Sequence, residues 1–257
     1  MTKSETFSAR IKSGERQLGI WTQIPNVVVA ENMAQSGSDF LLVDGEHAPI
    51  PPHALLEILP ATERYDMPVL YRVAWNRIEL IKAALDIGVN GIMVPMVNSA
   101  EEARAVVAAA KYPPSGKRGM GAWRASNYYQ VDAAYRKGAN IYTGVVLQIE
   151  TQEALNNLDE IASTPGVDAL YIGPADLALS LGIQLGHLND DLLVACKAVV
   201  AAAKKNGIGA GIDVATLDYL PTYRDLGLSL FTYGSDFSFI LDGSRAATQQ
   251  FRQAIER

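Results

Sequence analysis

Two segments decide the fold: GVVLQIET at residues 144–151 and GVDALYIGPADL at residues 166–177. Each is a short apolar run with a carboxylate at or just past its end, and a helical pattern separates them, as in a strand-helix-strand unit. The two carboxylates, Glu150 and Asp176, should therefore meet at one edge of a parallel sheet, where neighbouring strands lie roughly 5 Å apart. Because like charges so close repel each other, a divalent cation between them is the simplest solution.

The same alternation of short apolar runs and helical patterns continues along the whole chain. Several runs are apolar on both faces, which is typical of strands covered by helices on one side and by a packed interior on the other. The expected strands are 18–24, 39–45, 67–73, 88–96, 144–150, 169–173, 207–213 and 228–234. The expected helices are 26–36, 51–64, 77–87, 99–111, 152–163, 175–181, 191–206 and 237–256. Eight strands alternating with helices predict an α/β protein, a (β/α)₈ TIM barrel built as a single domain over residues 1–257.

The composition agrees with one globular domain, since 49% of the 257 residues are hydrophobic and 19% are charged. A net charge of −6 without a basic stripe argues against nucleic-acid partners. The N-terminus has no apolar signal region and no run is long enough to span a membrane, so a cytoplasmic protein without a membrane partner is expected. The single cysteine, Cys196, lies in an alanine-rich helical run and is expected to be a core residue.

Polar residues follow several of the expected strands, and barrel active sites lie at these carboxyl ends. Glu150 and Asp176 are suited to bind Mg²⁺ or Mn²⁺, although each could instead cap the helix that follows it. Arg72 ends an otherwise apolar strand, so its guanidinium requires an anion. That anion is either a substrate carboxylate or a structural partner, Asp44 or Glu46, and the two interpretations can coexist.

The other candidates depend on position alone. His47 directly follows a strand and has a side chain suited to a general base, or it is a structural loop histidine, whereas His53 and His187 are expected to be solvated. Trp21 lines a pocket or packs in the core or at its rim. Asp86 lies near the end of the third helix, away from the site of its own barrel, where a single chain would use it as a surface acid.

One class of aldol chemistry is not expected. A Schiff-base enzyme needs a lysine inside the barrel, yet every lysine falls in a helix, at a helix end, or in a terminal or loop segment. The sequence therefore offers no lysine in the position that iminium chemistry requires.

Motifs spread over most of the chain resemble those of one family. They are FLLVDGEHAP (40–49), YRV (71–73) followed by IKAALDIGVNGIMVPMV (81–97), AEEARAVVAAAKYPPSGKRG (100–119), LQIET (147–151) and ALYIGPADL (169–177). In this order and spacing they resemble the HpcH/HpaI aldolase family, the class II pyruvate aldolases, from about residue 17 to 240.

The resemblance implies a divalent-metal-dependent aldolase, a carbon–carbon lyase that reversibly cleaves 4-hydroxy-2-oxo acids to pyruvate, or hydroxypyruvate, and an aldehyde. It implies Mg²⁺, Mn²⁺ or Co²⁺ as cofactor and no organic cofactor. The alternatives are related enolate chemistry, namely oxaloacetate decarboxylation or an acyl-thioester lyase, and a non-catalytic barrel that binds a keto acid. The chain has Ala74-Trp75-Asn76-Arg77 where the family often has Pro-Trp-Asn-Asp, which leaves the aldehyde open.

The resemblance also assigns roles. Glu150 and Asp176 would be the metal ligands, Arg72 would bind the pyruvate moiety and stabilise its enolate, and His47 would be the general base, paired with Asp86. The other substrate contacts would be the side chain of Gln148, the backbone N–H groups from Gly173 through Ala175 to Asp176, and the ring of Trp21.

Family members are hexamers built as dimers of trimers, with sites completed by a neighbouring subunit. The resemblance therefore implies a homo-hexamer in which Asp86 serves an adjacent barrel. It also implies that the last helix, 237–256, can be exchanged between subunits.

Overall fold

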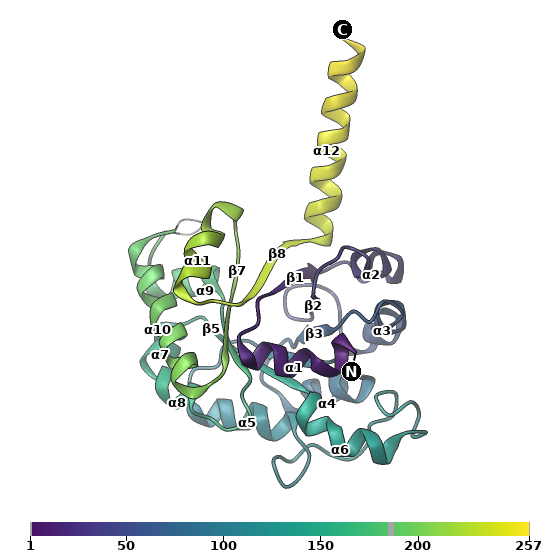
Figure 1. Cartoon of the computed structure of the whole chain (residues 1–257), viewed down its shortest axis with the longest axis vertical. Helices are drawn as coiled ribbons and strands as arrows, with labels where there is room; N and C mark the ends of the chain where they lie inside the picture. Colours follow the sequence, from purple (N-terminus) through teal and green to yellow (C-terminus); the bar gives the residue numbers. More distant parts are fainter. Residues whose placement is uncertain (1, 185–187, 257) are drawn as a thin grey trace.

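The structure, a computed structural model that describes residues 2–184 and 188–256, is built on a closed barrel of eight parallel strands in the order β1 to β8 (Figure 1). This confirms the predicted (β/α)₈ barrel: every predicted strand overlaps an observed one, and β1 and β8 each extend one residue beyond the predicted range. His187 lies outside the described residues. The strands are β1 (Gln17–Thr22), β2 (Phe40–Asp44), β3 (Val69–Arg72), β4 (Gly91–Val94), β5 (Gly144–Ile149), β6 (Ala169–Ile172), β7 (Gly209–Asp213) and β8 (Leu230–Ser235).

Helices connect the strands and cover the outside of the barrel (Figure 1). Cys196, in one of these helices, is buried as expected. Helices occur at every predicted position: α2 (Val27–Ala34), η1 (Pro52–Ala54) with α3 (Leu55–Glu63), α4 (Ile78–Ile87), α5 (Ala100–Ala110), α7 (Gln152–Asn156) with α8 (Leu158–Ala162), α9 (Pro174–Leu181), α10 (Asp190–Asn206) and α12 (Asp236–Ile255). The sequence analysis missed α1 (Lys3–Ser13), α6 (Asp132–Tyr142), and η2 (Leu217–Tyr219) with α11 (Leu220–Leu226).

Helix α1 closes the amino-terminal end of the barrel. Its only large apolar side chains, Phe7 and Ile11, are four residues apart and so share one helix face. Both are buried in the cluster that fills the barrel interior, and the Phe7 ring lies 5.3 Å from that of Phe40. The segment is otherwise polar, which is why its overall pattern did not indicate a core helix.

The alternation of side chains along the strands places the charged residues of the site directly above the apolar interior of the barrel. Along β2, Phe40 and Leu42 point inward, and Asp44 is the next residue on that face. Along β3 the same alternation runs from Leu70 to Arg72. Asp44 and Arg72 are paired in register, so the apolar interior ends in a row of charged side chains at the carboxyl ends of the strands.

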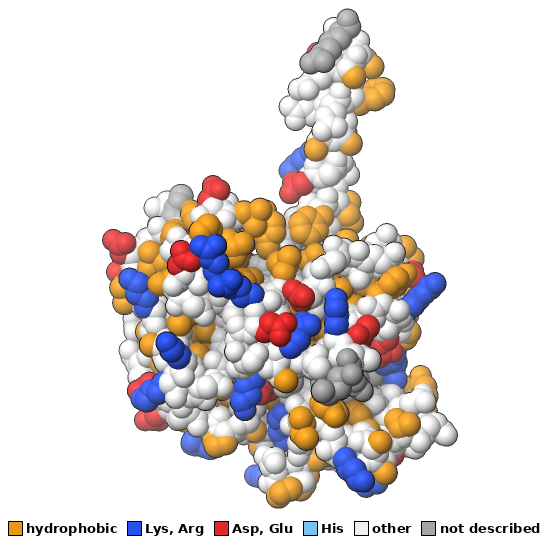
Figure 2. All heavy atoms as spheres, in the orientation of Figure 1, with side chains coloured by type: hydrophobic (Ala, Val, Ile, Leu, Met, Phe, Trp, Pro, Cys, Tyr) orange, Lys and Arg blue, Asp and Glu red, His pale blue; other side chains and the backbone are white. Residues whose placement is uncertain are grey.

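Helix α12 is confirmed as a helix, but it extends away from the barrel instead of covering it (Figure 1). Apolar side chains are visible along its length and around its base (Figure 2). Those that are exposed are Phe237, Phe239, Ile240, Leu241, Phe251 and Ile255. No described helix of the chain is both long and apolar enough to cross a membrane.

Candidate active site

A cavity of about 390 Å³ opens at the carboxyl ends of the strands, where the sequence predicts the site. Glu150 does not line it directly but is buried next to Gly173, one of the lining residues. The predicted site residues that line the cavity are Trp21, His47, Arg72, Gln148, Gly173, Ala175 and Asp176. The fold therefore brings together all the predicted site residues except Asp86.

Arg72 is the cationic centre of the site and is only 7% exposed. Its Nε and Nη2 donate to the two oxygens of Asp44, at 3.0 and 2.8 Å, and its Nη1 lies 3.2 Å from Oε2 of Glu46. The guanidinium also lies 4.4 Å from the centre of the Trp21 ring, which is a cation–π contact. The structural partners considered from the sequence are thus both present, and one face of Arg72 still borders the cavity.

Asp44 fixes the loop that follows β2. Burial raises the pKa of its carboxyl, but hydrogen bonds and charge attraction from Arg72, with help from Gln23, lower that pKa more, so the net shift is downward. The backbone N–H groups of Glu46 and His47 donate to Oδ1 of Asp44 at 3.0 and 3.1 Å. An ionised Asp44 therefore orients both Arg72 and the loop that carries His47.

Glu150 is held by donors on both of its oxygens. Oε1 accepts from the backbone N–H of Met96 at 2.6 Å, and Oε2 accepts from Nε2 of Gln148 at 2.7 Å. It does not cap helix α7, because the N-cap is Thr151, whose hydroxyl accepts from the backbone of Ala154. Glu150 is thus positioned for another purpose than helix capping.

Asp176 lies in the first turn of α9, and its side chain is exposed to the cavity. No side chain caps this helix, so Asp176 makes no capping hydrogen bond. Glu150 therefore does not have the alternative role of a helix cap, whereas Asp176 does occupy the position of an acid in the first turn of a helix.

Crowded carboxylates perturb one another in this site. The pKa of Glu150 is raised to about 7, mainly by burial and also by the charges of Glu46 and Asp176, whereas the Met96 N–H and Arg72 act to lower it. Burial likewise raises the pKa of Glu46 to about 7, against the attraction of Arg72 and with repulsion from Asp44 and Asp176. The site holds more negative charge than its one guanidinium balances.

These residues fit a hard divalent cation, which prefers carboxylate oxygens and water. A cation would relieve the excess negative charge, and the buried Oε1 of Gln148 has no hydrogen-bond partner, so it can accept from a ligand or from water. Glycine at position 173 leaves room for Glu150, since a Cβ there would lie 2.4 Å from Oε2 of Glu150 and would displace this carboxylate. No group of three or more His, Cys, Asp or Glu side chains able to hold a metal occurs in residues 2–184 and 188–256. The predicted pair, Glu150 and Asp176, would leave the remaining positions around a cation to water or substrate.

His47 is at the cavity rim, with its side chain 61% exposed. Its Nε2 lies 3.8 Å from Oε2 of Glu46. The imidazole is free to meet a substrate, and Glu46 lies between it and Arg72.

Asp86 does not line the cavity. It is on α4 and forms an ion pair with Arg118, whose Nη2 lies 2.8 Å from Oδ1 of Asp86 and also donates to the hydroxyl of Tyr135. Arg118 is buried, so Asp86 is a partner in a structural ion pair and not the free surface acid that was considered for a single chain.

Two residues of the cavity were not among the candidates from the sequence, and a third was given too narrow a role. Glu46 was considered only as a partner of Arg72, whereas its carboxylate also faces His47. Gln23 and Asp213 both line the cavity, from the ends of β1 and β7. The signal for Asp213 was present, because it is the last residue of the predicted strand 207–213, which reads GIGAGID.

Comparisons with known proteins give the family of the chain and confirm its fold. A family model described as HpcH/HpaI aldolase/citrate lyase matches residues 17–240. A 4-hydroxy-2-oxo-heptane-1,7-dioate aldolase of Escherichia coli is 35% identical over 96% of this chain and 94% of its own length.

Two solved structures share the fold over nearly their full length. An HpcH/HpaI aldolase/citrate lyase family protein from Burkholderia cenocepacia J2315 has a TM-score of 0.90 at 32% identity, covering 96% of this chain and 99% of its own. The citrate synthase SbnG has a TM-score of 0.85 at 27% identity, covering 97% and 98%.

Proposed function

The chain belongs to the HpcH/HpaI aldolase/citrate lyase family, and from this we propose that it is a divalent-metal-dependent aldolase. It would cleave 4-hydroxy-2-oxo acids reversibly to pyruvate, or hydroxypyruvate, and an aldehyde. The observation that carries the proposal is the convergence of Asp176 and Arg72 on one cavity, with Glu150 buried beside it, in a site where carboxylates outnumber cations.

Glu150 and Asp176 would hold Mg²⁺, Mn²⁺ or Co²⁺. When bound, the cation supplies Lewis acidity toward the oxygens of the 2-oxo acid. Arg72 adds fixed positive charge where the enolate oxygen develops, and its bonds to Asp44 prevent the guanidinium from reorienting during the reaction.

The start of α9 supports binding of the substrate carboxylate. The first N–H groups of a helix have no partner within it and attract anions. Ala175 and Asp176 lie in this first turn after the N-cap Gly173, and all three line the cavity. Pro174, at the first helical position, has no N–H to lose.

His47 would accept the proton of the C4 hydroxyl as the C3–C4 bond breaks and return it in the reverse direction. Its exposure at the rim suits contact with the aldehyde end of the substrate, while Arg72 and Glu150 lie deeper.

The proposal can be tested without knowing the aldehyde. Exchange of the C3 protons of pyruvate, and separately of hydroxypyruvate, with deuterated water is followed by proton NMR with Mg²⁺ or Mn²⁺ and with chelator. Exchange that requires both enzyme and metal supports enolate formation. Absence of exchange with both donors in the presence of metal contradicts the proposal.

The similarity to a citrate synthase favours a second candidate, enolate chemistry with an acyl thioester. Release of free thiol from acetyl-coenzyme A in the presence of oxaloacetate distinguishes it from aldol cleavage. If C3 exchange depends on metal and no thiol is released, the aldolase function is supported over the thioester reaction.

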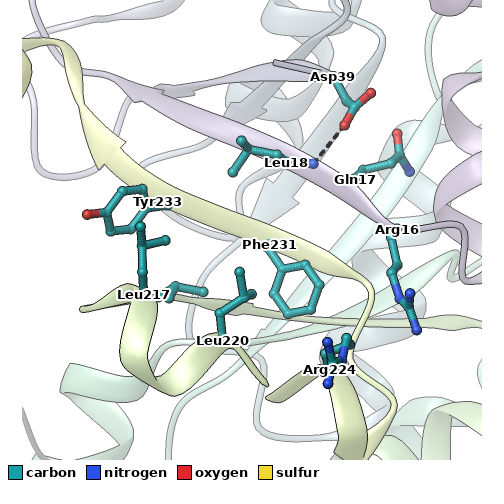
Figure 3. Close-up of a pocket in the computed structure, with 10 residues that line it drawn as sticks. Arg16, Gln17, Leu18, Asp39, Leu217, Leu220, Arg224, Phe231 and Tyr233 are labelled. Carbon is teal, nitrogen blue, oxygen red and sulfur yellow. Dashed lines mark hydrogen bonds between the residues drawn. The ribbon is translucent and has the colours of Figure 1, made fainter. Parts of the chain in front are cut away.

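We further propose that α12 packs on a second subunit, as part of a homo-hexamer. A barrel helix must bury its apolar side, yet that of α12 is exposed. The barrel in turn has an uncovered apolar surface: a groove of about 310 Å³ lies over β1 and β8, between Leu18, Leu217, Leu220, Phe231 and Tyr233 (Figure 3). Exchange of this helix between two identical subunits would bury the apolar side of α12 and cover the groove of the partner.

Charge at the groove is consistent with this arrangement. Arg16 and Arg224 lie together at one end of it (Figure 3), and Asp39 also lines it. Helix α12 carries charges of both signs, Asp242, Arg245 and Arg252, with Glu256 just beyond its end. Sedimentation of wild type and of Leu241→Asp tests the assembly: a loss of the oligomer in the variant supports it, and a monomeric wild type contradicts it. In the assembly Asp86 could serve a neighbouring site, as the family resemblance implies.

A further inference from the structure

The wall of the cavity formed by the ends of β7 and β1 is built differently from the metal side. Asp213 lines this wall, and its Oδ1 accepts from Nε1 of Trp21 at 2.8 Å and from the hydroxyl of Thr232 at 2.5 Å. Its other oxygen, Oδ2, has no hydrogen-bond partner among the residues that the structure describes. Asp213 therefore presents a fixed carboxylate oxygen to the cavity.

Gln23 presents a second acceptor on the same side. Its Nε2 donates to Oδ2 of Asp44 at 2.8 Å, which orients the amide and leaves Oε1 without a partner in the described part of the chain. The Trp21 ring connects this wall to Arg72, since its Nε1 donates a hydrogen bond to Asp213 and its face makes the cation–π contact with the Arg72 guanidinium. Both residues are half-exposed and line the cavity, so a ligand with hydrogen-bond donors can take the place of water at these two oxygens.

The charge of the cavity limits the ligand further. Among the described residues that line it, Arg72 alone has a permanent positive charge, and this charge already faces Asp44 and Glu46. Asp176 and Asp213 add negative charge on two sides. A second carboxylate on the substrate would find no cation in this wall and would be repelled by Asp213.

We propose that the wall of Asp213 and Gln23 binds the aldehyde end of the substrate and selects uncharged, hydroxylated aldehydes over aldehydes that carry a carboxylate. This inference rests on the proposed aldolase function and names its substrate class. The hydroxyl groups donate to Oδ2 of Asp213 and Oε1 of Gln23, and a site built to bind a hydroxyl discriminates strongly against analogues that lack it. The chain thus differs from its relatives named for a 1,7-dioate, a compound with a carboxylate at each end.

The test compares aldehydes with one donor. Initial rates of aldol addition to pyruvate, or to hydroxypyruvate if only that donor exchanges, are measured with glyceraldehyde, propanal and succinic semialdehyde. We expect kcat/KM for glyceraldehyde to exceed that for succinic semialdehyde at least about tenfold, with propanal also below glyceraldehyde. Equal or better use of succinic semialdehyde by the wild-type enzyme overturns the inference.

Asp213→Asn separates charge from shape, because the amide oxygen can still accept from Trp21 and Thr232. We expect the ratio of kcat/KM for succinic semialdehyde to that for glyceraldehyde to rise about tenfold or more. The matched control is Asp218→Asn, which removes the same charge from an exposed position on η2 and should leave this ratio unchanged. An unchanged ratio in Asp213→Asn overturns the role of this carboxylate.

The outcomes also distinguish this inference from the proposed function. Metal-dependent C3 exchange with no preference between the aldehydes contradicts only the proposed substrate class and leaves the aldolase function supported. Absence of both exchange and aldol addition removes the aldolase function, and this inference with it.

Discussion

The two ends of the barrel balance their charges in opposite ways. At the amino-terminal end, the buried carboxyl of Asp168 shares its surroundings with the ammonium groups of Lys111 and Lys12. Lys111 donates to the carbonyls of Asn140 and Thr143, and helix α1 closes this end.

At the carboxyl-terminal end, four acids surround one guanidinium, and the end is open. Asp44, Glu46, Glu150 and Asp176 all interact with Arg72 or with one another. Stability alone would favour the balanced arrangement, because buried like charges cost free energy. The difference indicates that the open end is organised for a cation and a substrate, and the closed end for folding.

The largest expected effect is at the open end. Glu150→Gln keeps the shape of the side chain but removes the charge that would hold the metal, so metal-dependent C3 exchange should fall below detection, a loss of at least about 10⁴-fold. Calorimetric titration with Mn²⁺ should show lost affinity, which separates metal binding from catalysis. Glu153→Gln, at an exposed position on α7, is the control and should behave as wild type. Full activity of Glu150→Gln would remove it from the metal site.

The closed end predicts the reverse pattern. Phe7→Ala removes a fully buried ring from the barrel interior and should lower the free energy of unfolding by about 3–5 kcal/mol. The exchange rate per folded molecule should not change, because α1 is at the other end of the barrel from the site. Denaturant titration measures the first quantity and NMR exchange the second, with the exposed Val194→Ala as control. A large loss of exchange in molecules that remain folded would show that the two ends are coupled.

Arg72→Lys tests how much the geometry of the cation matters at the open end. A lysine keeps the charge but cannot bind both oxygens of Asp44, so the positive charge is no longer fixed. We expect exchange to slow by about 10²–10³-fold, as when one preorganised donor is lost. Arg136→Lys, in an exposed pair with Asp132, is the control. A rate within threefold of wild type would reduce Arg72 to a simple counter-charge.

The sequence predicted the open end better than the closed one. Strand ends can be recognised from short apolar runs, and barrel closure puts those ends together, so the positions of Glu150, Asp176 and Arg72 at this end of the barrel were predicted without a structure. Helix α1 was missed because Phe7 and Ile11 are two apolar residues in a polar segment. They become buried only because the amino-terminal end of the barrel interior is left for them to fill.

Other features depend on contacts that no local pattern contains. Asp213 acquires its role from Trp21 and Thr232, which reach it only when β8 pairs with both β7 and β1. The ion pair between Asp86 and Arg118 joins a helix to an irregular segment 32 residues later. Such pairings follow from the closed barrel and from loop paths, not from periodicity.

The smallest expected effect is a pH dependence of stability, which sharpens the contrast between the ends. Glu150 and Glu46 have folded-state pKa values of about 7, above the ordinary value of 4.5 that applies in the unfolded chain. Between these values the folded protein binds more protons than the unfolded one, so the stability that these groups contribute is complete below about pH 4.5 and is lost as the pH rises through 7.

In the absence of metal, the melting temperature should therefore fall between pH 5 and pH 8. Glu150→Gln and Glu46→Gln should each flatten this slope, because each removes one titrating group. Mg²⁺ should stabilise the wild-type protein more at pH 8 than at pH 5, since the cation binds the ionised carboxylates and binding to the folded state raises stability by mass action. A melting temperature that rises over this range without metal would mean that the negative charge of the open end is already compensated within the chain, and the main argument for a cation there would be lost.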